Sequence, residues 1–503
     1  MDVLPVAASA VPRRRTRAAG RAFLRLFLPL VAGALAGIAL TLVGRGLWTL
    51  ATEPRGHCGG EGIAAQPCPA GTGAIPGIAW PFLLVGVPVA VAYAIRGRWI
   101  SRGAMLAAGV AGVLSGQAIF GTVAGIALPT AWQVPSGSST ALSTVGTLQY
   151  GDSVIWVGTS EAVSYDAATG QRRWTLAMPR DSVACAVSNP GTAAVGLIGY
   201  GAGQPGEECD GVLAVDLGTG RRLWAAPLPG ASDGATLLVA GGSGVIVGAD
   251  GLSAVSARTG ARRWAFSGAR GCTIDQAAAS QGAIAALFRC GTGISVTDLD
   301  AATGQPAWTS GLPQADSGGD LDLLSADPVV VTDWVLPAST GTGPAHGGSK
   351  SAVAFSASGR PAAFPLGTGD LGLQLAGEEY NQPPVVTDGM LVGVAATGQA
   401  SISLAGYRLP DGHLQWQVSI PDDYVDAITA AGGEVYFTDQ VIPALFAVST
   451  GSGALRPLGS ITGLYLGATP VTLYPVGRHY VLVNPDAADG IPVIASVTGL
   501  NVS

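Results

Sequence analysis

The pattern of hydrophobic and polar residues changes once along the chain, near residue 130. Before this point there are three long apolar runs, Leu26–Gly44, Ile78–Ile95 and Gly103–Leu128. Each is long enough to cross a bilayer as a helix, which takes about 18 or more mostly apolar residues. After this point apolar residues alternate with polar ones in short segments that end at glycine-rich turns, as in β-strands. The pattern therefore predicts an α-helical membrane domain followed by a β-rich domain.

The arginines predict the direction in which the helices run. Six arginines precede the first run and three separate the second from the third, and short cytoplasmic segments are enriched in Arg and Lys. We therefore expect a multi-pass protein of the cell membrane with a cytoplasmic N-terminus and an extracytoplasmic β domain. A cleaved signal peptide at residues 13–36 is the alternative. The expected parts are a basic cytoplasmic tail at 1–25 and an anchor of three transmembrane helices at 26–128, with helices at about 26–48, 78–95 and 103–128 and an external loop at 51–77.

The β domain is built from a repeated phrase. Val163–Trp174, Leu213–Trp224, Ser253–Trp264 and Thr297–Trp308 are full copies, Gly406–Trp416 is a shortened one, and Phe446–Pro457 lacks the tryptophan. In each, an alternating strand meets a turn whose glycine can take a positive φ, and a second strand follows, which predicts a β-hairpin. A tryptophan follows four residues after the turn glycine in five copies, so we expect it to be a buried anchor between neighbouring sheets, with a ligand-binding role as the alternative. The turn glycines are Gly170, Gly220, Gly260, Gly304 and Gly412, and the docking positions are Trp132, Trp174, Trp224, Trp264, Trp308 and Trp416.

The phrase Asp-x-x-Thr-Gly-x-x-x-Trp, complete at Asp166, Asp216 and Asp300, resembles the tryptophan-docking repeat of the PQQ-like β-propellers. The resemblance covers residues 131–503. This family includes quinoprotein dehydrogenases and the propeller lipoprotein of the outer-membrane barrel-assembly machinery. It implies an extracytoplasmic all-β propeller of four-stranded antiparallel blades.

The repeat spacing predicts eight blades. Docking positions from Trp132 to Trp308 are 40 to 50 residues apart, and the longer interval to Trp416 requires one more unit, at Ala352–Phe364. Residues 131–503 give 46.6 residues per blade for eight blades and 53.3 for seven, and propeller repeats usually have about 40 to 50. Seven blades is the alternative. The last repeat ends before its outer strand, so we expect Ala131–Pro135 to supply that strand and close the ring.

All six cysteines lie on the predicted outer side of the membrane, where disulfides persist. They are close in sequence in three pairs, so we expect structural disulfides. Metal binding is the alternative, but no Cys-x-x-Cys occurs and the four histidines are far apart. The pairs are Cys58 with Cys68, Cys185 with Cys209, and Cys272 with Cys290.

The charge distribution argues against binding of nucleic acid. The 503 residues carry a net charge of −7, and residues 1–130 hold eleven arginines against three acidic residues, which leaves −15 for residues 131–503. An acidic domain repels phosphates. Two groups of aspartates lack the spacing of a calcium loop and are expected in solvated turns, namely Asp316, Asp320 and Asp322, and Asp422, Asp423 and Asp426.

No catalytic constellation stands out, so we expect a binding or scaffold module for a protein, an envelope polymer or a small ligand, without a cofactor. One alternative is a membrane-bound dehydrogenase that uses pyrroloquinoline quinone (PQQ) with calcium. The resemblance implies that such enzymes carry adjacent cysteines beside the quinone, and no two cysteines are adjacent here. The other alternative is a sensor coupled to the helices. The long connections Tyr200–Cys209 and Pro337–Ser351 are the expected recognition loops.

Overall fold

The structure, a computed structural model, divides into two compact units, one ending at residue 127 and the other beginning at residue 128. The residues it describes are 27, 30–44, 79, 82–84, 86–89, 91–92, 95, 99–123, 127–128, 130–134, 144–189, 194–202, 209–228, 236–248, 251–291, 293–312, 320–335, 349–368, 371–373, 383–397, 401–420, 425–439, 444–461, 471–484 and 493–498.

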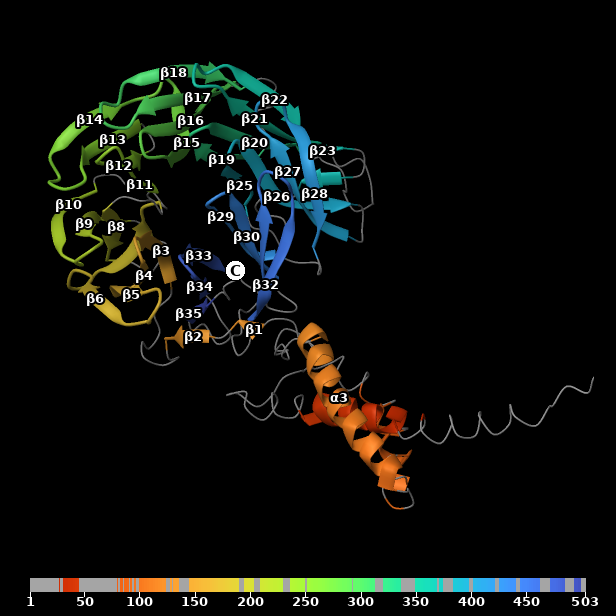
Figure 1. Cartoon of the computed structure of the whole chain (residues 1–503). Helices are drawn as coiled ribbons and strands as arrows, with labels where there is room; N and C mark the ends of the chain where they lie inside the picture. The colour runs from red at the N-terminus through yellow and green to blue at the C-terminus, as the bar shows by residue number, and fades with distance from the viewer. Residues whose placement is uncertain are drawn as a thin grey trace, which may run out of the picture. The chain divides into compact units, whose positions relative to one another are not determined.

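The second unit is an eight-bladed β-propeller of antiparallel sheets (Figure 1). The prediction of eight blades, not seven, is confirmed. Blade 1 contains β3 Thr144–Tyr150, β4 Ser153–Gly158, β5 Glu161–Asp166 and β6 Arg172–Ala177; blade 2, β7 Val183–Val187, β8 Val195–Gly201, β9 Gly211–Asp216 and β10 Arg222–Pro227; blade 3, β11 Thr236–Ala240, β12 Ser243–Gly248, β13 Gly251–Ser256 and β14 Arg262–Phe266; blade 4, β15 Cys272–Ala279, β16 Ala283–Cys290, β17 Gly293–Asp300 and β18 Pro306–Gly311.

The second half of the ring is less regular, because two blades carry additional short strands. Blade 5 contains β19 Asp320–Ala326, β20 Val329–Val335, β21 Ser349–Phe355 and β22 Pro361–Pro365; blade 6, β23 Gly367–Thr368, β24 Leu371–Leu373, β25 Val385–Thr387, β26 Met390–Thr397, β27 Ser401–Arg408 and β28 His413–Ser419; blade 7, β29 Val425–Ala431, β30 Glu434–Asp439, β31 Ala444–Ser449 and β32 Leu455–Ile461 with β1 Ala127–Leu128; blade 8, β33 Thr472–Val476, β34 His479–Asn484 and β35 Val493–Thr498 with β2 Thr130–Gln133.

The ring is closed by the segment that the sequence indicates. Strand β2 pairs with β35, and Trp132 lies opposite Ser496. The last blade is therefore built from both ends of the propeller sequence, which leaves no exposed sheet edge at the closure.

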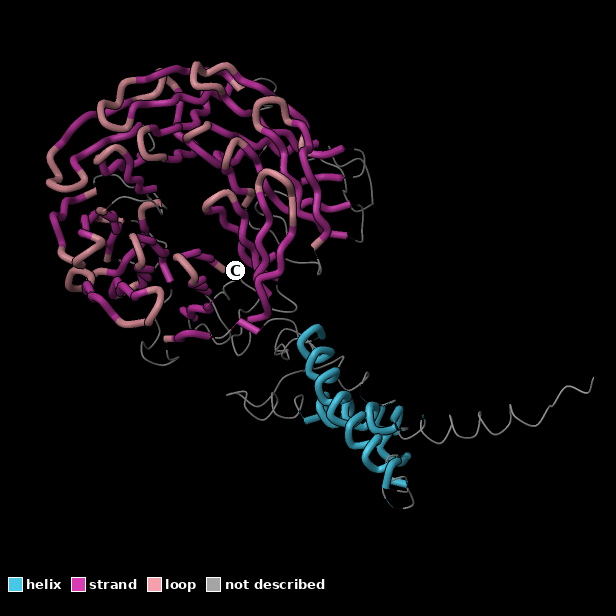
Figure 2. The backbone as a smooth tube through the Cα atoms, in the orientation of Figure 1, coloured by secondary structure: helices cyan, strands magenta, loops and turns pink. Residues whose placement is uncertain are grey.

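The core lies in bands between neighbouring blades. Middle strands are largely apolar because sheets pack on both of their faces; every residue of β4 is buried. Outer strands such as β6 alternate between exposed and half-buried residues. First strands lie toward the centre of the ring and last strands toward the outside, as Figures 1 and 2 show.

Antiparallel pairing gives the propeller two distinct faces. Connections between the first and second strands and between the third and fourth strands of a blade emerge on one face, which we name the turn face. Connections between the second and third strands, and between blades, emerge on the opposite face, the loop face.

The first unit contains helix α3, Trp99–Val123, a helical stretch at residues 30–44, and helical residues at 79, 82–84, 86–89, 91–92 and 95, within the expected second helix (Figure 2). The expected third helix at 103–128 is corrected, because it starts at Trp99 and Ala127–Leu128 is strand β1. Pro129 disfavours helical backbone in the residue before it, and the Leu128 side chain is completely buried in the propeller core.

The helices in this unit approach closely at glycines, as small residues allow. A methyl group on Gly33, Gly37 or Gly112 would overlap backbone atoms of the facing helix. Within the part of the chain that the structure describes, no helix is long and apolar enough to cross a membrane. The expected tail at 1–25 and external loop at 51–77 lie outside the described residues.

Candidate functional site

The docking tryptophans lie between neighbouring blades. The indole N–H donates to a backbone carbonyl in the turn of the next blade, and the ring packs over that turn's glycine. The five N–H bonds run from Trp132 to Ala167 (2.9 Å), Trp174 to Leu217 (3.0 Å), Trp224 to Ala257 (2.8 Å), Trp264 to Ala301 (3.2 Å) and Trp416 to Thr450 (2.7 Å), over Gly170, Gly220, Gly260, Gly304 and Gly453 respectively. These tryptophans are therefore part of the inter-blade packing.

The turn glycines adopt a positive φ, and the aromatic docking residue of the preceding blade packs on each of them. Gly170 has φ 68° and Gly412 has φ 65°, and the Phe364 ring packs on Gly412 where the other junctions have a tryptophan. Two further turn glycines, Gly359 and Gly453, also have an aromatic ring packed on them, and they were not among those predicted. In the sequence, each lies in a degenerate copy of the repeat, Ala352–Phe364 and Phe446–Pro457 respectively.

Trp308 is the exception among the docking tryptophans. Its ring packs on Gly359, but its buried Nε1 makes no hydrogen bond to the turn of the next blade in the described part of the propeller, and faces the Asp298 carboxyl instead. The turn of blade 5 is one residue shorter, because the Gly359 N–H bonds to Ser356 three residues back, whereas the Gly170 N–H bonds to Asp166 four residues back. We attribute the loss of the bond to a turn carbonyl to this shortening.

Asp298 lies opposite Trp308 in the sheet register, where the equivalent residues are the small Ser164, Ala214, Ala254 and Gly406. Burial and the nearby Asp327 carboxylate raise the pKa of Asp298, and they outweigh the hydrogen bond from Trp308, which lowers it. Both aspartates line a hollow of about 510 Å³ on the turn face between blades 4, 5 and 6.

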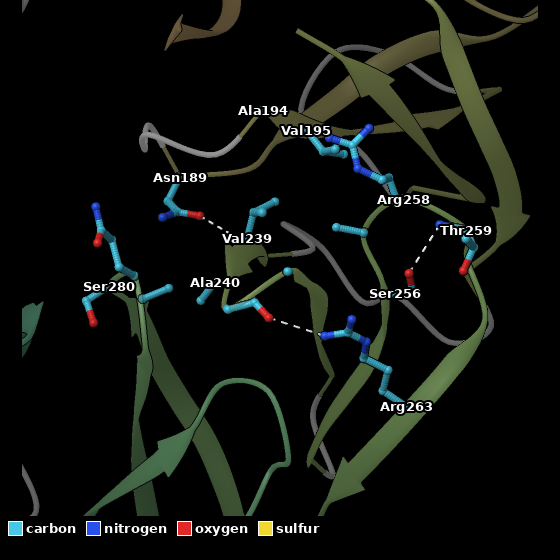
Figure 3. A pocket seen from close by; sticks show the side chains of 15 residues that line it. Asn189, Ala194, Val195, Val239, Ala240, Ser256, Arg258, Thr259, Arg263 and Ser280 are labelled. Atoms are coloured by element: carbon cyan, nitrogen blue, oxygen red, sulfur yellow. Dashed lines mark hydrogen bonds between the residues drawn. The ribbon is translucent and has the colours of Figure 1, made fainter. Parts of the chain in front are cut away.

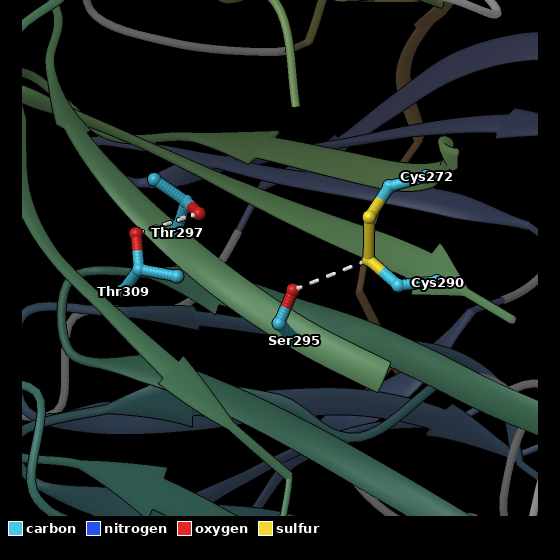
Figure 4. Close-up of a disulfide and its surroundings, with 5 residues drawn as sticks. All are labelled: Cys272, Cys290, Ser295, Thr297 and Thr309. Carbon is cyan, nitrogen blue, oxygen red and sulfur yellow. Dashed lines mark hydrogen bonds between the residues drawn. A yellow bond between two sulfur atoms is a disulfide. The ribbon is translucent and has the colours of Figure 1, made fainter. Parts of the chain in front are cut away.

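The disulfides lie on the loop face. Cys185 in β7 bonds to Cys209, just before β9, and the bridge passes over Gly199 of the strand between them. Cys272 and Cys290 are bonded at directly opposite positions of β15 and β16 (Figure 4). The third expected pair, Cys58 and Cys68, lies outside the described residues.

Both expected recognition loops join second strands to third strands and so leave from the loop face. Most of each, residues 203–208 and 336–348, lies outside the residues that the structure describes. The base of the first loop is fastened by the disulfide, by the Asp210 N–H bond to the Tyr200 carbonyl (2.9 Å) and by the Ala202 N–H bond to the Asp210 carboxylate (3.0 Å).

On the turn face, Arg173 bridges two carboxylates, Asp152 at 2.7 Å and Asp166 at 2.5 Å. Asp166 also accepts hydrogen bonds from Ala168 N and from the backbone and hydroxyl of Thr169. Desolvation alone would raise the pKa of Asp166, but these bonds from Arg173 and Thr169 outweigh it and lower the pKa to about 2. The repeated aspartate is therefore a turn cap, ionised at neutral pH.

A second, larger hollow on the turn face has a volume of about 880 Å³ and lies between blades 2, 3 and 4 (Figure 3). Its polar lining includes Asn189, Ser256, Arg258, Thr259 and Arg263. Its apolar wall is formed by Val195, Val239, Ala240, Ala257 and Ala279.

Asp426 differs from its expected place in a solvated turn. It lies in strand β29 and is only 6% exposed. This burial raises its pKa to about 7. Strand β29 packs against strands of the two neighbouring blades, β25 and β33, and so the local pattern of aspartates gave no signal of this burial.

The described donor groups do not fit a calcium-bound quinone. In the described portion of the chain, no three His, Cys, Asp or Glu side chains lie together in a way that could hold a metal ion. Carboxylates such as Asp152, Asp166 and Glu434 are instead paired with arginines. These carboxylates therefore stabilise turns and strands, and do not form the oxygen cluster that calcium prefers.

Comparison with known proteins gives one family match and several similar folds. The family model described as outer membrane protein assembly factor BamB matches residues 121–266, 158–398 and 293–463. The crystal structure of BamB from Moraxella catarrhalis is 14% identical, covering 74% of this chain and 99% of that one, with a TM-score of 0.44.

Two other solved structures are similar at the same level. The computationally designed Ika8 protein is 14% identical (73% of this chain and 98% of that one, TM-score 0.47). The quinohemoprotein alcohol dehydrogenase ADHIIG from Pseudomonas putida HK5 is 13% identical (75% of this chain and 77% of that one, TM-score 0.45). No curated protein sequence matches the chain.

Proposed function

This chain belongs to the family described as outer membrane protein assembly factor BamB, and on that premise we propose that its propeller is a scaffold that binds a protein partner through its loop face. The family name supports a role in assembly. The observation that carries the choice of face is the Cys185–Cys209 bridge, which clamps the base of the first recognition loop to β7.

A clamped loop on a rigid ring supports binding for a physical reason. Ordering a loop on binding costs conformational entropy, and a base fixed beforehand reduces that cost. The ring itself is stiffened by side-chain bonds between blades, such as Asn189 Oδ1 accepting from Val239 N at 2.8 Å and Gln276 Oε1 accepting from Leu323 N at 2.7 Å. The loop face therefore offers recognition loops on a support that does not rearrange.

We further propose that the N-terminal unit attaches the propeller to the membrane, with the propeller outside the cytoplasm. The support is the exposed apolar surface of its helices together with the disulfides, which persist in oxidising compartments. The large apolar side chains more than 60% exposed are Leu40, Leu84, Ile95, Leu106, Val110 and Leu114.

The binding proposal is tested with the full chain in its own membrane by exchanging one loop at a time. Replacing residues 203–208 with a Gly-Ser linker of equal length, with both cysteines retained, removes the recognition loop and leaves the clamp. We expect co-purification of the partner to fall at least tenfold. The control replaces residues 249–250, a short connection that also leaves from the loop face, with a Gly-Ser linker of their own length. Unchanged co-purification after loss of both recognition loops would refute binding at the loop face.

A further inference from the structure

The large hollow on the turn face contains an arginine whose charge is not balanced. The residue just before the docking position is an arginine in three blades, namely Arg173 in blade 1, Arg263 in blade 3 and Arg456 in blade 7. Arg173 is paired with Asp152 and Asp166, and Arg456 makes two bonds of 2.7 and 2.9 Å to Glu434. These two arginines are therefore neutralised.

Blade 3 lacks both carboxylates at the equivalent positions. Strand register places Gly242 where blade 1 has Asp152, and Ser256 where blade 1 has Asp166. Arg263 instead donates to two neutral acceptors, the Gly241 carbonyl at 3.2 Å and the Ser243 hydroxyl at 3.0 Å. Its positive charge remains uncompensated by any carboxylate in the described lining of the hollow.

A second arginine adds to this charge. Arg258 lines the same hollow at the turn position held by Ala168 in blade 1. Its contact with the Asp216 carboxylate is long, at 3.8 Å, and the Arg258 side chain is 63% exposed, so the pair is weak. In Figure 3, Arg258 lies in the upper part of the view and Arg263 in the lower part, with Ser256 between them, so the hollow carries positive charge at two places.

Asn189 supplies a neutral donor to the hollow. Its backbone N–H bonds to the Leu237 carbonyl at 3.2 Å, and its Oδ1 accepts from Val239 N at 2.8 Å. The orientation of the side-chain amide is thus set, and its Nδ2 group has no acceptor within the described residues. A fixed amide donor and two guanidinium groups are suited to oxyanions.

We propose that this hollow binds a small organic acid, that is, a carboxylate or phosphate group attached to an apolar body. The arginines would hold the anionic group. The wall of Val195, Val239, Ala240, Ala257 and Ala279 would hold the body. A volume of about 880 Å³ is in the range of small-molecule sites and too large for a bare inorganic anion. This site lies on the turn face and is independent of partner binding at the loop face.

Equivalent positions in blades 1 and 3 provide the variants that test this proposal. Ser256→Asp restores in blade 3 the carboxylate that neutralises Arg173 in blade 1, at a position where aspartate is a natural turn cap. The variant should fold at least as well as the parent while losing the anion site. Arg263→Gln removes the charge directly. Arg173→Gln is the matched control, because it removes the equivalent arginine from a blade where the charge is already balanced.

The full chain is titrated calorimetrically with phenyl phosphate, benzoate and inorganic phosphate at constant ionic strength, and thermal unfolding checks each variant. We expect saturable binding of phenyl phosphate or benzoate that is at least tenfold weaker in Ser256→Asp and Arg263→Gln and within twofold of the parent in Arg173→Gln. Preference between the two probes identifies the anionic group, phosphate or carboxylate. The proposal is overturned if the folded parent binds neither aromatic acid, if inorganic phosphate binds as tightly as phenyl phosphate, or if Arg173→Gln weakens binding as much as Arg263→Gln.

Discussion

The hydroxyl groups of Thr147 and Tyr474 lie 2.6 Å apart, although 327 positions separate them in the sequence. They join the first strand of blade 1 to the first strand of blade 8, on the inner side of the ring. Burial raises the pKa of Tyr474 to about 12, so this hydroxyl stays protonated across the physiological range. On the outer side, Trp132 in β2 bonds to the Ala167 carbonyl of blade 1. The junction between blades 8 and 1 is therefore stabilised by a hydrogen bond on the inner side of the ring and by another on its outer side.

Loss of the outer contact is expected to open the ring. Trp132→Ala removes the indole that stacks on Tyr165 at 6.0 Å and packs over Gly170. Truncation of a packed aromatic residue to alanine costs about 3 to 5 kcal/mol. We expect a lower unfolding temperature and faster hydrogen exchange in β2 and β35 than in blades 3 and 4. Uniform exchange across all eight blades would contradict a latch at this junction.

Two tryptophans at equivalent positions should respond differently to phenylalanine. Trp174→Phe loses a well-formed hydrogen bond to the Leu217 carbonyl, whereas Trp308→Phe removes an N–H that faces the Asp298 carboxyl without a well-formed hydrogen bond in the described propeller. A buried hydrogen bond contributes about 1 kcal/mol. Trp174→Phe should therefore destabilise the protein by about 1 kcal/mol more than Trp308→Phe, measured by chemical unfolding. Equal losses would mean that the contact between Trp308 and Asp298 is as strong as the bond from Trp174 to the Leu217 carbonyl.

The Cys185–Cys209 bridge should depend on the absence of a side chain at Gly199. A methyl group there would come within 2.8 Å of the Cys209 sulfur and 3.3 Å of the Cys185 sulfur. Gly199→Ala should leave these two thiols open to alkylation, with Cys272 and Cys290 still bridged as the internal control. Loss of the bridge, which closes a loop of 24 residues, should cost about 3 kcal/mol. Full protection of all four cysteines in the variant would disprove the close contact.

Asp426 predicts a pH dependence of stability. Its pKa is raised to about 7 in the folded chain, above the ordinary value of 3.8. Its contribution is therefore complete below about pH 4 and is lost as the pH rises through 7. Asp426→Asn abolishes this loss, so the stability of the variant relative to the parent should rise by on the order of 3 kcal/mol between pH 4 and pH 8. Parallel pH profiles of the two proteins would show that the carboxyl titrates normally.

The full chain is expected not to bind PQQ with calcium, because no three His, Cys, Asp or Glu side chains among the described residues lie together as a metal site, and carboxylates such as Asp152 and Glu434 are paired with arginines. Calorimetric titration of the folded, disulfide-bonded protein checks this, with a quinoprotein dehydrogenase as positive control. Stoichiometric binding accompanied by a new quinone absorbance would restore the dehydrogenase hypothesis and justify a substrate screen with a dye acceptor.

The propeller was predictable because its repeat is local. Each hairpin carries its own turn residues, such as Asp166 and Gly170, and the spacing of Trp174 from Trp224 reports the length of a blade. The closing strand was predictable for the same reason, since the last repeat stops where its outer strand belongs. The end of the third helix was not, because hydropathy continues to Leu128 while tertiary packing makes that residue a strand.

The candidate sites were largely not predictable, because they depend on positions that only the folded ring aligns. Arg263 lacks a carboxylate partner because Gly242 and Ser256 occupy the positions that Asp152 and Asp166 hold in blade 1. Strand register in the folded ring is needed to identify these equivalent positions. The burial of Asp426 likewise depends on neighbouring blades. Short-range pattern locates the turns, but it does not show which charges meet across them.

The most direct test of the scaffold proposal is photo-crosslinking in intact cells from single positions on each face. A photoreactive residue is placed at exposed sites of the loop face, Ser160, Arg180 and Arg270, and of the turn face, Ala168, Ala302 and Ser452. We expect a recurrent protein adduct from loop-face positions, lost on exchange of both recognition loops, and none from the turn face. Adducts from the turn face alone, or none from the loop face of the folded protein, would contradict it.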